Sequence, residues 1–531
     1  MRVTTRRGLG LILSGAFLLW TTTTPAQQPT TAKPTNDQSK DAPKPAKTKA
    51  DEPAKTEDKP KSTTDETLVV TRHQSKVAGK ELSYTATTGL MPIRDAKGET
   101  EAHIFFMAYK LDDAGPSAKR PLLFSFNGGP GSASVWLHMG ALGPRRVALP
   151  DTPTIAPPPF QLVENESSWL DQADLVFIDP IGTGLSRAAK PELNAKFHSL
   201  NGDIASVGEF IRLYLTRYER WNSPLYLIGE SYGTTRAAGL AGHLIDEGIA
   251  FSGIALVSCA LDFQAFVFNP GNDLPFPTYL PSYTASAWYH KKLPADLQAK
   301  PLPAVLAEVE QFCDRDYAAI LARGDQLSAT EISATAGRLA RYTGLAASDI
   351  EDHHLRIDMS HFTGVLLKDQ KRSMGRFDAR YLGIESTAVS DRPTFDPSLA
   401  AVRAPYTSTF NQYLRSTLNY KSDAPYYILG GGVGRWDWQR DMGYPATTRE
   451  LRDAMTKNPH MKVLIASGYY DLATPYRAVE HSLAGLGLDP ILRKNITIAK
   501  YEAGHMMYLD PPSLRKLKQD GTALIDGARA K

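Results

Sequence analysis

Six short apolar segments between residues 121 and 501 constrain the fold of this chain more than any other feature. Side chains along a strand point alternately to the two faces of the sheet, and in these segments most positions of both sets are apolar. This is typical of strands covered on both faces. Amphipathic helical patterns lie between them, such as residues 199–218, where Asn201 or Asp203 is a candidate N-cap. Strands that alternate with helices predict an α/β fold with a mostly parallel, doubly covered sheet. The segments are 121–126, 174–179, 224–229, 252–258, 462–467 and 495–501.

The rest of the chain divides this predicted fold into parts. Residues 66–264 and 426–531 contain the alternating strands and helices and form the two parts of the predicted core. Residues 265–425 break the alternation, are rich in aromatic and helical patterns, and show no convincing sheet strand. We therefore predict a mainly helical insertion over 265–425, of the kind that often forms a cap over a site.

The first 65 residues differ from the rest. Residues 1–26 combine a basic start, an apolar run too short to span a bilayer, and a small-residue cleavage motif. This pattern predicts a signal peptide and an exported, periplasmic or extracellular protein with no stable membrane span after cleavage; an uncleaved membrane anchor is the alternative. Residues 27–65 are dominated by lysine, proline, threonine and aspartate, which predicts a disordered linker.

Charge and cysteine content argue against two classes of function. The chain has 60 basic and 57 acidic side chains and a net charge of +3, so its charge predicts no nucleic-acid partner. Cys259 and Cys313 are its only cysteines, and neither has a second cysteine or a histidine at zinc-ligand spacing, so no metal site is predicted. Export permits a disulfide between them, and two buried free thiols are equally compatible with the sequence. The oligomeric state is left open.

One segment, LYLIGESYGTTRAAGL, combines a strand pattern, the motif Gly229-x-Ser231-x-Gly233 and a helical stretch of small residues. This order is typical of a nucleophile elbow, in which a tight turn exposes a serine hydroxyl above the sheet edge. The N-terminus of the following helix then faces any negative charge that develops on a substrate. A purely structural turn is the alternative, and we predict that Ser231 is a nucleophile.

A nucleophilic serine requires a base and an acid that orients the base. Asp471 and His505 each lie in a loop directly after a predicted strand. Because ligands bind at the carboxyl ends of parallel strands, we expect both side chains near Ser231. His481 in a helical pattern and Asp489 in a turn are the weaker candidates.

A glycine-rich loop, Asn-Gly-Gly-Pro-Gly at residues 127–131, follows the strand pattern 121–126. Glycines let backbone N–H groups approach a ligand closely, so this loop can supply the second part of an oxyanion hole. By itself it is also compatible with an ordinary turn.

Four segments taken together resemble the signature stretches of the serine carboxypeptidases, which have an α/β-hydrolase fold. They are FNGGPGSASVW, GESYG, SGYYDLATPY and EAGHMMYLD, and the resemblance covers about residues 70–520. It implies that Ser231 is the nucleophile, His505 the base and Asp471 the orienting acid. It also implies a peptide substrate, an acyl-enzyme on the serine, and no metal ion or organic cofactor.

The same resemblance implies roles for four further residues. Gly129 and Tyr232 would donate backbone N–H groups to the oxyanion. Asn127 and a protonated Glu230 would hold the C-terminal carboxylate of the substrate by hydrogen bonds. Because burial and an incoming anion both raise the pKa of a glutamate, the resemblance favours activity at acidic pH.

The sequence departs from eukaryotic members of that family at several positions. Ala141 in MGALGP stands where a second glutamate is common, which makes the acidic optimum less secure. Ser132 stands where a cysteine is usual, and the family's dense disulfide set is missing, which suits a bacterial branch. Arg145 and Arg146 are candidate carboxylate ligands in compensation, or they pair with surface acids.

The sequence therefore predicts a secreted serine-type carboxypeptidase. The first alternative is an esterase or acyltransferase that uses the same triad, and the second is a binding module with an inactive site. The preferred residue at the cleaved bond and the natural substrate are not determined by the sequence. The cap aromatics Tyr283, Trp288 and Tyr289 are equally plausible as pocket walls and as core packing.

Overall fold

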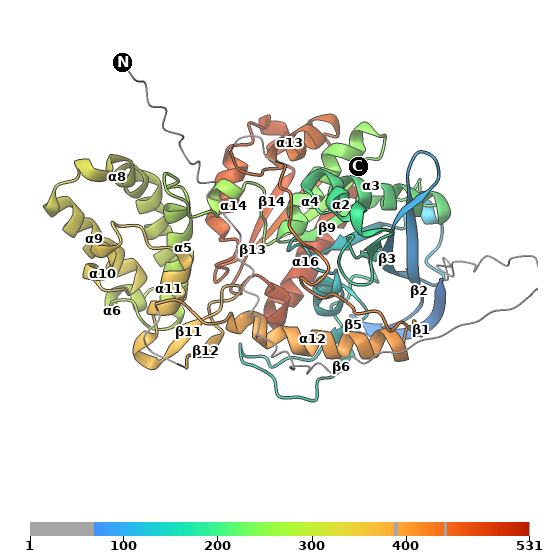
Figure 1. Ribbon diagram of the computed structural model, residues 1–531, viewed down its shortest axis with the longest axis horizontal. Coiled ribbons are helices and arrows are strands. Elements are labelled where there is room, and N and C mark those ends of the chain that lie inside the picture. The colour runs from blue at the N-terminus through green and yellow to red at the C-terminus, as the bar shows by residue number, and fades with distance from the viewer. Residues whose placement is uncertain (1–67, 387–390, 440–442, 530–531) are drawn as a thin grey trace, which may run out of the picture. The chain divides into compact units, whose positions relative to one another are not determined.

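A mixed ten-stranded sheet lies at the centre of the computed structural model (Figure 1), which describes residues 68–386, 391–439 and 443–529. The strand order is β1-β2-β3-β7-β4-β9-β10-β13-β14, with β8 paired to β3. The six strands from β7 to β14 run parallel, and β1 to β3 form an antiparallel edge. The bounds are β1 Val69–Val77, β2 Lys80–Arg94, β3 Thr100–Leu111, β4 Leu122–Phe126, β7 Asp174–Ile178, β8 Arg187–Ala188, β9 Leu225–Glu230, β10 Gly253–Val257, β13 Lys462–Gly468 and β14 Ile496–Tyr501.

The six apolar segments are these six parallel strands, so the predicted α/β class is confirmed. Alternate residues of one strand enter different cores: Leu225 and Leu227 of β9 face one core, and Tyr226 and Ile228 face the other. Helices α3 (Leu200–Arg217), α4 (Tyr232–Asp246), α13 (Thr448–Lys457) and α14 (Tyr476–Ala484) cover the first face. Helices α1 (Val135–Leu137), α12 (Pro397–Ser416) and α16 (Pro511–Arg529) cover the second. This double cover explains why the strands read as continuous apolar runs.

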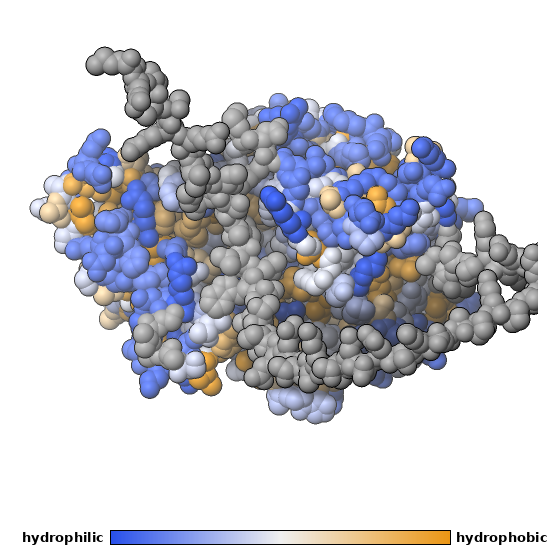
Figure 2. All heavy atoms as spheres, viewed as in Figure 1, coloured by the Kyte–Doolittle hydropathy of each residue, from blue (hydrophilic) through white to orange (hydrophobic). Residues whose placement is uncertain are grey.

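Helices between β10 and α12 form a third apolar cluster (Figure 1). Its buried side chains include Val305, Leu306, Val309 and Leu339, while hydrophilic residues predominate over these helices on the face shown in Figure 2. The helices are α5 (Pro275–Tyr289), α6 (Ala295–Gln298), α7 (Leu302–Phe312), α8 (Ala318–Arg323), α9 (Ala329–Thr343), α10 (Ala347–Asp352) and α11 (Met359–Val365). We call this group the cap helices.

The segment 265–425 differs from the prediction in two respects. It contains a small antiparallel sheet of β11 (Arg372–Met374) and β12 (Leu382–Ile384), strands too short to give a periodic signal. Its last helix, α12, places Val402, Tyr406 and Phe410 in the core of the central sheet rather than among the cap helices. Other elements are α2 (Asn194–Phe197), α15 (Pro490–Arg493) and the hairpin of β5 (Arg145–Val147) and β6 (Leu162–Glu164).

Several smaller predictions can also be compared with the structure. The N-cap of α3 is Ser199, whose hydroxyl accepts from the Gly202 N–H, so the prediction of Asn201 or Asp203 as the cap is wrong. Cys259 and Cys313 are both free and buried, which answers the question of pairing. Among the described residues, no helix is both long and apolar enough to cross a membrane. The predicted signal peptide and linker lie outside the described residues.

Candidate active site

Ser231 lies at a sharp turn between strand β9 and helix α4. Its backbone has φ 60° and ψ −130°, a conformation that residues other than glycine rarely adopt and that clusters at functional sites. A Cβ atom on Gly229 would lie 2.1 Å from the Gly233 carbonyl oxygen, so the turn requires glycine at 229. The serine is half-buried at the carboxyl end of β9, which is the geometry of a nucleophile elbow.

Asp471 and His505 form a buried pair after strands β13 and β14. His505 Nδ1 lies 2.8 Å from Asp471 Oδ2, and neither side chain is more than 3% exposed. The N–H groups of Ala473 and Thr474 donate to Asp471 Oδ1 at 2.8 and 2.9 Å, and the Thr474 hydroxyl donates to Oδ2 at 2.7 Å. These bonds stabilise the ionised carboxylate and leave His505 Nε2 as the nitrogen available to another group.

Strand β10 connects the serine segment to the histidine segment. The Ser231 N–H donates to the Val257 carbonyl oxygen at 2.9 Å, and the adjacent Ser258 hydroxyl donates to the His505 carbonyl oxygen at 2.5 Å. The Ser231 hydroxyl makes no hydrogen bond to any residue in the described part of the chain, His505 included. Hydrogen bonds between a nucleophile and its base are often long and tighten only when substrate binds.

Phe377, in the turn between β11 and β12, holds His505 from the side of the insertion. The backbone N–H of His505 donates to the Phe377 carbonyl oxygen at 2.6 Å. The two rings stack with their centroids 4.9 Å apart. Sequence reasoning missed this residue, because a single phenylalanine more than 120 positions from the histidine carries no local signal.

The glycine-rich loop lies directly against the N-terminus of α4. A Cβ atom on Gly128 would lie 2.4 Å from the Tyr232 amide nitrogen, so only glycine permits this approach. The N–H groups of Gly129 and Tyr232 donate to no other described residue. Two free N–H groups, one in the loop and one at the start of a helix, are suited to bind an oxyanion.

Asn127 and Glu230, the residues predicted to bind a carboxylate, are both buried next to this turn. The Leu137 N–H donates to Asn127 Oδ1 at 3.0 Å, which directs the Asn127 amide nitrogen elsewhere. The Asn127 amide and the Tyr508 hydroxyl lie near the Glu230 carboxyl group, but Asn127 Nδ2 and Glu230 Oε2 are buried without a hydrogen bond of good geometry in the described structure. Buried polar atoms without partners are uncommon in native proteins, and these two atoms are free to form hydrogen bonds with a polar ligand group.

Burial raises the pKa of Glu230 to about 7. His505, the Tyr508 hydroxyl and the Asn127 amide lower the pKa, while Asp471 raises it further, and burial outweighs the lowering contributions. At and below neutral pH a large fraction of this carboxyl group is therefore protonated and can donate a hydrogen bond.

A buried ion pair fixes the relative positions of the loop and the helix. Arg236 of α4 donates through Nε to Asp203 of α3 at 2.8 Å and through a terminal nitrogen to the Asn127 carbonyl oxygen at 2.7 Å. The Tyr232 hydroxyl also donates to Asp203, at 3.0 Å. The sequence suggested Asp203 as a cap of α3. In the structure it instead orients two residues beside the candidate site.

Comparison with known proteins identifies the family. A sequence model of the family described as serine carboxypeptidase matches residues 78–506, which include every predicted site residue. The chain belongs to the serine carboxypeptidase family.

Curated relatives in this family are similar over part of their length. The pheromone-processing carboxypeptidase KEX1 of Saccharomyces cerevisiae is 30% identical over 155 residues, which are 27% of this chain and 20% of that protein. Serine carboxypeptidase-like 36 of Arabidopsis thaliana is 31% identical over 148 residues, which are 27% of this chain and 26% of that protein. The chain thus matches about a fifth to a quarter of the length of these relatives.

A solved structure shares the fold. The crystal structure of the prohormone-processing carboxypeptidase Kex1(delta)p from Saccharomyces cerevisiae has a TM-score of 0.53 and 17% identity. The similarity covers 83% of this chain and 90% of that one. This similarity supports the α/β-hydrolase fold of this chain.

Ala141, at the position where the resemblance implies a second glutamate, is fully buried in a helical turn over His138–Leu142. Tyr508 packs against the neighbouring Gly140, where a Cβ atom would lie 2.4 Å from its ring. The Tyr508 hydroxyl faces Glu230 and is itself buried without a partner. Burial and Glu230 raise the pKa of Tyr508 well above its usual value, so the phenol keeps its proton. Sequence reasoning missed Tyr508, although it lies only three residues after His505.

Of the remaining candidates, His481, Asp489 and Arg145 lie outside this group of residues. His481 is an exposed residue of α14, and Asp489 caps α15 through the Ile491 N–H at 2.8 Å. Arg145 forms a surface ion pair with Glu164 at 3.6 Å. Arg146 lines a small pocket together with Gly140, Tyr406 and Tyr508.

Proposed function

We propose that this chain is a serine-type carboxypeptidase that removes C-terminal residues from peptides. The observation that carries the proposal is the pair of unpartnered buried atoms, Asn127 Nδ2 and Glu230 Oε2, immediately beside the elbow of Ser231. An ordinary esterase has no need to keep a carboxyl and an amide desolvated at this place. A peptide with a free C-terminus supplies the carboxylate that both groups can bind.

In the proposed mechanism the Ser231 hydroxyl attacks the carbonyl carbon of the last peptide bond. His505 Nε2 accepts the hydroxyl proton, and Asp471 stabilises the imidazolium that forms. The N–H groups of Gly129 and Tyr232 donate to the oxyanion of the tetrahedral intermediate. His505 then protonates the leaving amine, and a water molecule activated by His505 releases the acyl group from the serine.

A comparison of one peptide with its C-terminal amide tests this function. We expect kcat/KM to be at least tenfold higher for the free acid, because loss of a hydrogen bond to a charged group costs about 1.5–3 kcal/mol. Equal turnover of acid and amide, with retained labelling of Ser231, would favour the esterase or acyltransferase alternative. An absence of both hydrolysis and labelling would favour a binding module.

The Glu230→Gln variant should change the pH dependence. In the wild type, kcat/KM for the free peptide is expected to fall as pH rises through about 7, because an ionised Glu230 repels the substrate carboxylate. Glutamine donates a hydrogen bond at every pH, so this fall should be absent in the variant. A pH profile for each protein with the acid and the amide substrates measures the effect.

Stability provides a second readout for the same variant. The folded-state pKa of Glu230 lies above its ordinary value of 4.5, so its contribution to stability is complete below that value and is lost as pH rises towards 7 and beyond. The Tm difference between Glu230→Gln and the wild type should therefore shift in favour of the variant from pH 5 to pH 8. Identical pH profiles of activity and of Tm would contradict the role given to Glu230.

Tyr508 is proposed as a third donor to the substrate carboxylate, in place of the missing second glutamate. Tyr508→Phe should raise KM for the free peptide about 10- to 100-fold, since it removes one hydrogen bond to a charged group. Values of kcat and KM for the acid and the amide measure this. The effect should be small for the amide; an equal loss on both substrates would mean that the phenol only supports packing.

We also propose that the protein is exported and comes from a bacterial branch of the family. The basic and apolar pattern of residues 1–26 supports export, and Ser132 together with two free cysteines supports the branch. Export should yield a mature protein that begins after residue 26, and mass spectrometry of the N-terminus in cell fractions would measure this.

A further inference from the structure

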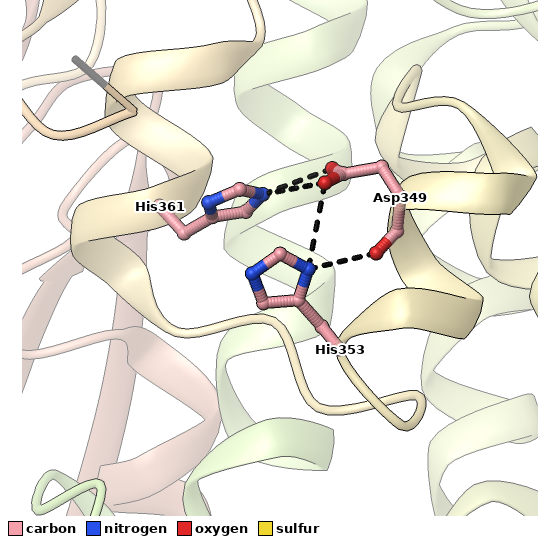
Figure 3. A group of neighbouring side chains, drawn as sticks. All are labelled: Asp349, His353 and His361. Atoms are coloured by element: carbon pink, nitrogen blue, oxygen red, sulfur yellow. Dashed lines mark hydrogen bonds and ion pairs between the residues drawn. The ribbon is translucent and has the colours of Figure 1, made fainter.

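We propose that Asp349, His353 and His361 form a binding site for a divalent transition-metal ion, with Zn²⁺ as the best-matched ion. The three side chains come from helix α10, the loop that follows it and the first turn of helix α11 (Figure 3). They lie among the cap helices and are separate from the candidate active site. The prediction from the sequence considered only cysteine spacing and missed this group.

The spacing of the three donor atoms suits one tetrahedral ion. His361 Nε2 lies 3.0 and 2.9 Å from the two carboxylate oxygens of Asp349. His353 Nδ1 lies 3.4 Å from Asp349 Oδ1, and one donor atom of each residue lies within 4.8 Å of the others. Bonds of about 2.0–2.1 Å to Zn²⁺ place neighbouring ligands about 3.3 Å apart. Small movements of the side chains are therefore enough to receive an ion.

Both imidazoles lie against the same carboxylate, whereas a simple hydrogen-bonded pair contains one imidazole. The rings of His353 and His361 lie with their centroids 4.0 Å apart, at an angle of 37° (Figure 3). Each neutral imidazole has one nitrogen without a proton that can bind a metal. Two histidines and one carboxylate are a donor set that zinc proteins use, with a fourth position left for water.

The three side chains are partly buried, and solvent can reach them. The side chain of His361 is 7% exposed, that of Asp349 25% and that of His353 39%, so solvent reaches the site from the side of His353. His353 Nδ1 also lies 2.8 Å from the Asp349 carbonyl oxygen, a contact that the ion would replace. Asp391 lies near both imidazoles, and its carboxylate is ion-paired with Lys368.

An ion at this place would brace the cap helices. The loop between α10 and α11 contains His354 and Leu355 with φ of 51° and 63°, a conformation that histidine tolerates and that is strained for leucine. In α11, Phe362 stacks on Tyr283 of α5 with ring centroids 4.2 Å apart. Metal bonds from α10 and the loop to α11 would hold this strained segment and its aromatic contact in place.

The test uses the full chain, stripped with EDTA and then titrated with Zn²⁺. Calorimetry should show one saturable site per chain, and a thermal scan should show a higher Tm at saturation. Titration with Co²⁺ should give the intense visible absorption of a tetrahedral complex.

Variants assign the site. His353→Ala removes the most exposed ligand and should weaken Zn²⁺ affinity at least tenfold while the metal-free Tm stays close to that of the wild type. His354→Asn is the matched control, because it changes the adjacent histidine, keeps a residue that tolerates positive φ, and should bind as the wild type does. Absence of saturable binding in the wild type, or equal binding by His353→Ala, would overturn the proposal.

Discussion

Replacing Ser231 by alanine is expected to lower kcat for peptide hydrolysis by about 10⁴-fold or more, and the variant should still bind the substrate. The reason is geometric. The serine lies at the elbow after β9, and Ser258 at the end of the neighbouring strand β10 donates to the carbonyl oxygen of His505, whose Nδ1 is bonded to Asp471. The nearby Thr234 hydroxyl is already bonded to the Ser231 carbonyl oxygen. A fluorophosphonate probe should label the wild type once and leave the variant unlabelled.

The control is Ser132→Ala, in the same glycine-rich region. The Ser132 hydroxyl accepts a hydrogen bond from the Trp136 indole N–H at 2.7 Å, which holds the tryptophan ring in place. Its loss should leave labelling intact. Full activity in Ser231→Ala, with a folded protein and no contaminating hydrolase, would overturn the assignment of the nucleophile.

Replacing Asp203 by alanine is expected to destabilise the protein by about 3–5 kcal/mol, because it leaves the Arg236 guanidinium buried without its counter-ion. The side chain of Asp203 is 3% exposed and that of Arg236 is 1% exposed, so solvent cannot replace the lost partner. The midpoint of urea unfolding, with the slope held common to both proteins, measures this loss. Oxyanion and carboxylate binding should weaken as well, since Arg236 also holds the Asn127 carbonyl group.

Two comparisons isolate the mechanism. In the double variant Asp203→Leu with Arg236→Met no buried charge remains, so it should lose less stability than Asp203→Ala. Asp316→Ala removes an ion pair with Arg338 that is about half exposed on both sides, and it should change stability by less than about 1 kcal/mol. Similar losses in the buried and the exposed single variants would contradict the argument.

The sequence predicted the fold because its signals were local. Each strand of the parallel sheet carries its own apolar run, and the elbow at Ser231 needs only a strand, two glycines and a helix in order. Asp471 and His505 were selected for the same reason, since both follow a strand directly. The structure joins them by a 2.8 Å hydrogen bond, and their catalytic roles stay a prediction.

What the sequence did not predict depends on contacts between distant segments. Ser199, not Asp203, caps α3, because Asp203 has a tertiary partner in Arg236 that no local pattern reveals. Helix α12 was assigned to the insertion by its position in the chain, yet its apolar face covers the central sheet. Tyr508 faces Glu230 across the packed turn at Gly140, which depends on side-chain contacts rather than on spacing.

The contact between Phe377 and His505 has a consequence for protein engineering. A chimera that transplants the whole of 265–425 from a relative would also exchange the aromatic ring and the carbonyl group that hold His505. Substrate preference and chemical competence would then change together. Junctions placed outside the small β11–β12 hairpin, so that the native hairpin is retained, should allow the helices before it to be exchanged without disturbing the imidazole.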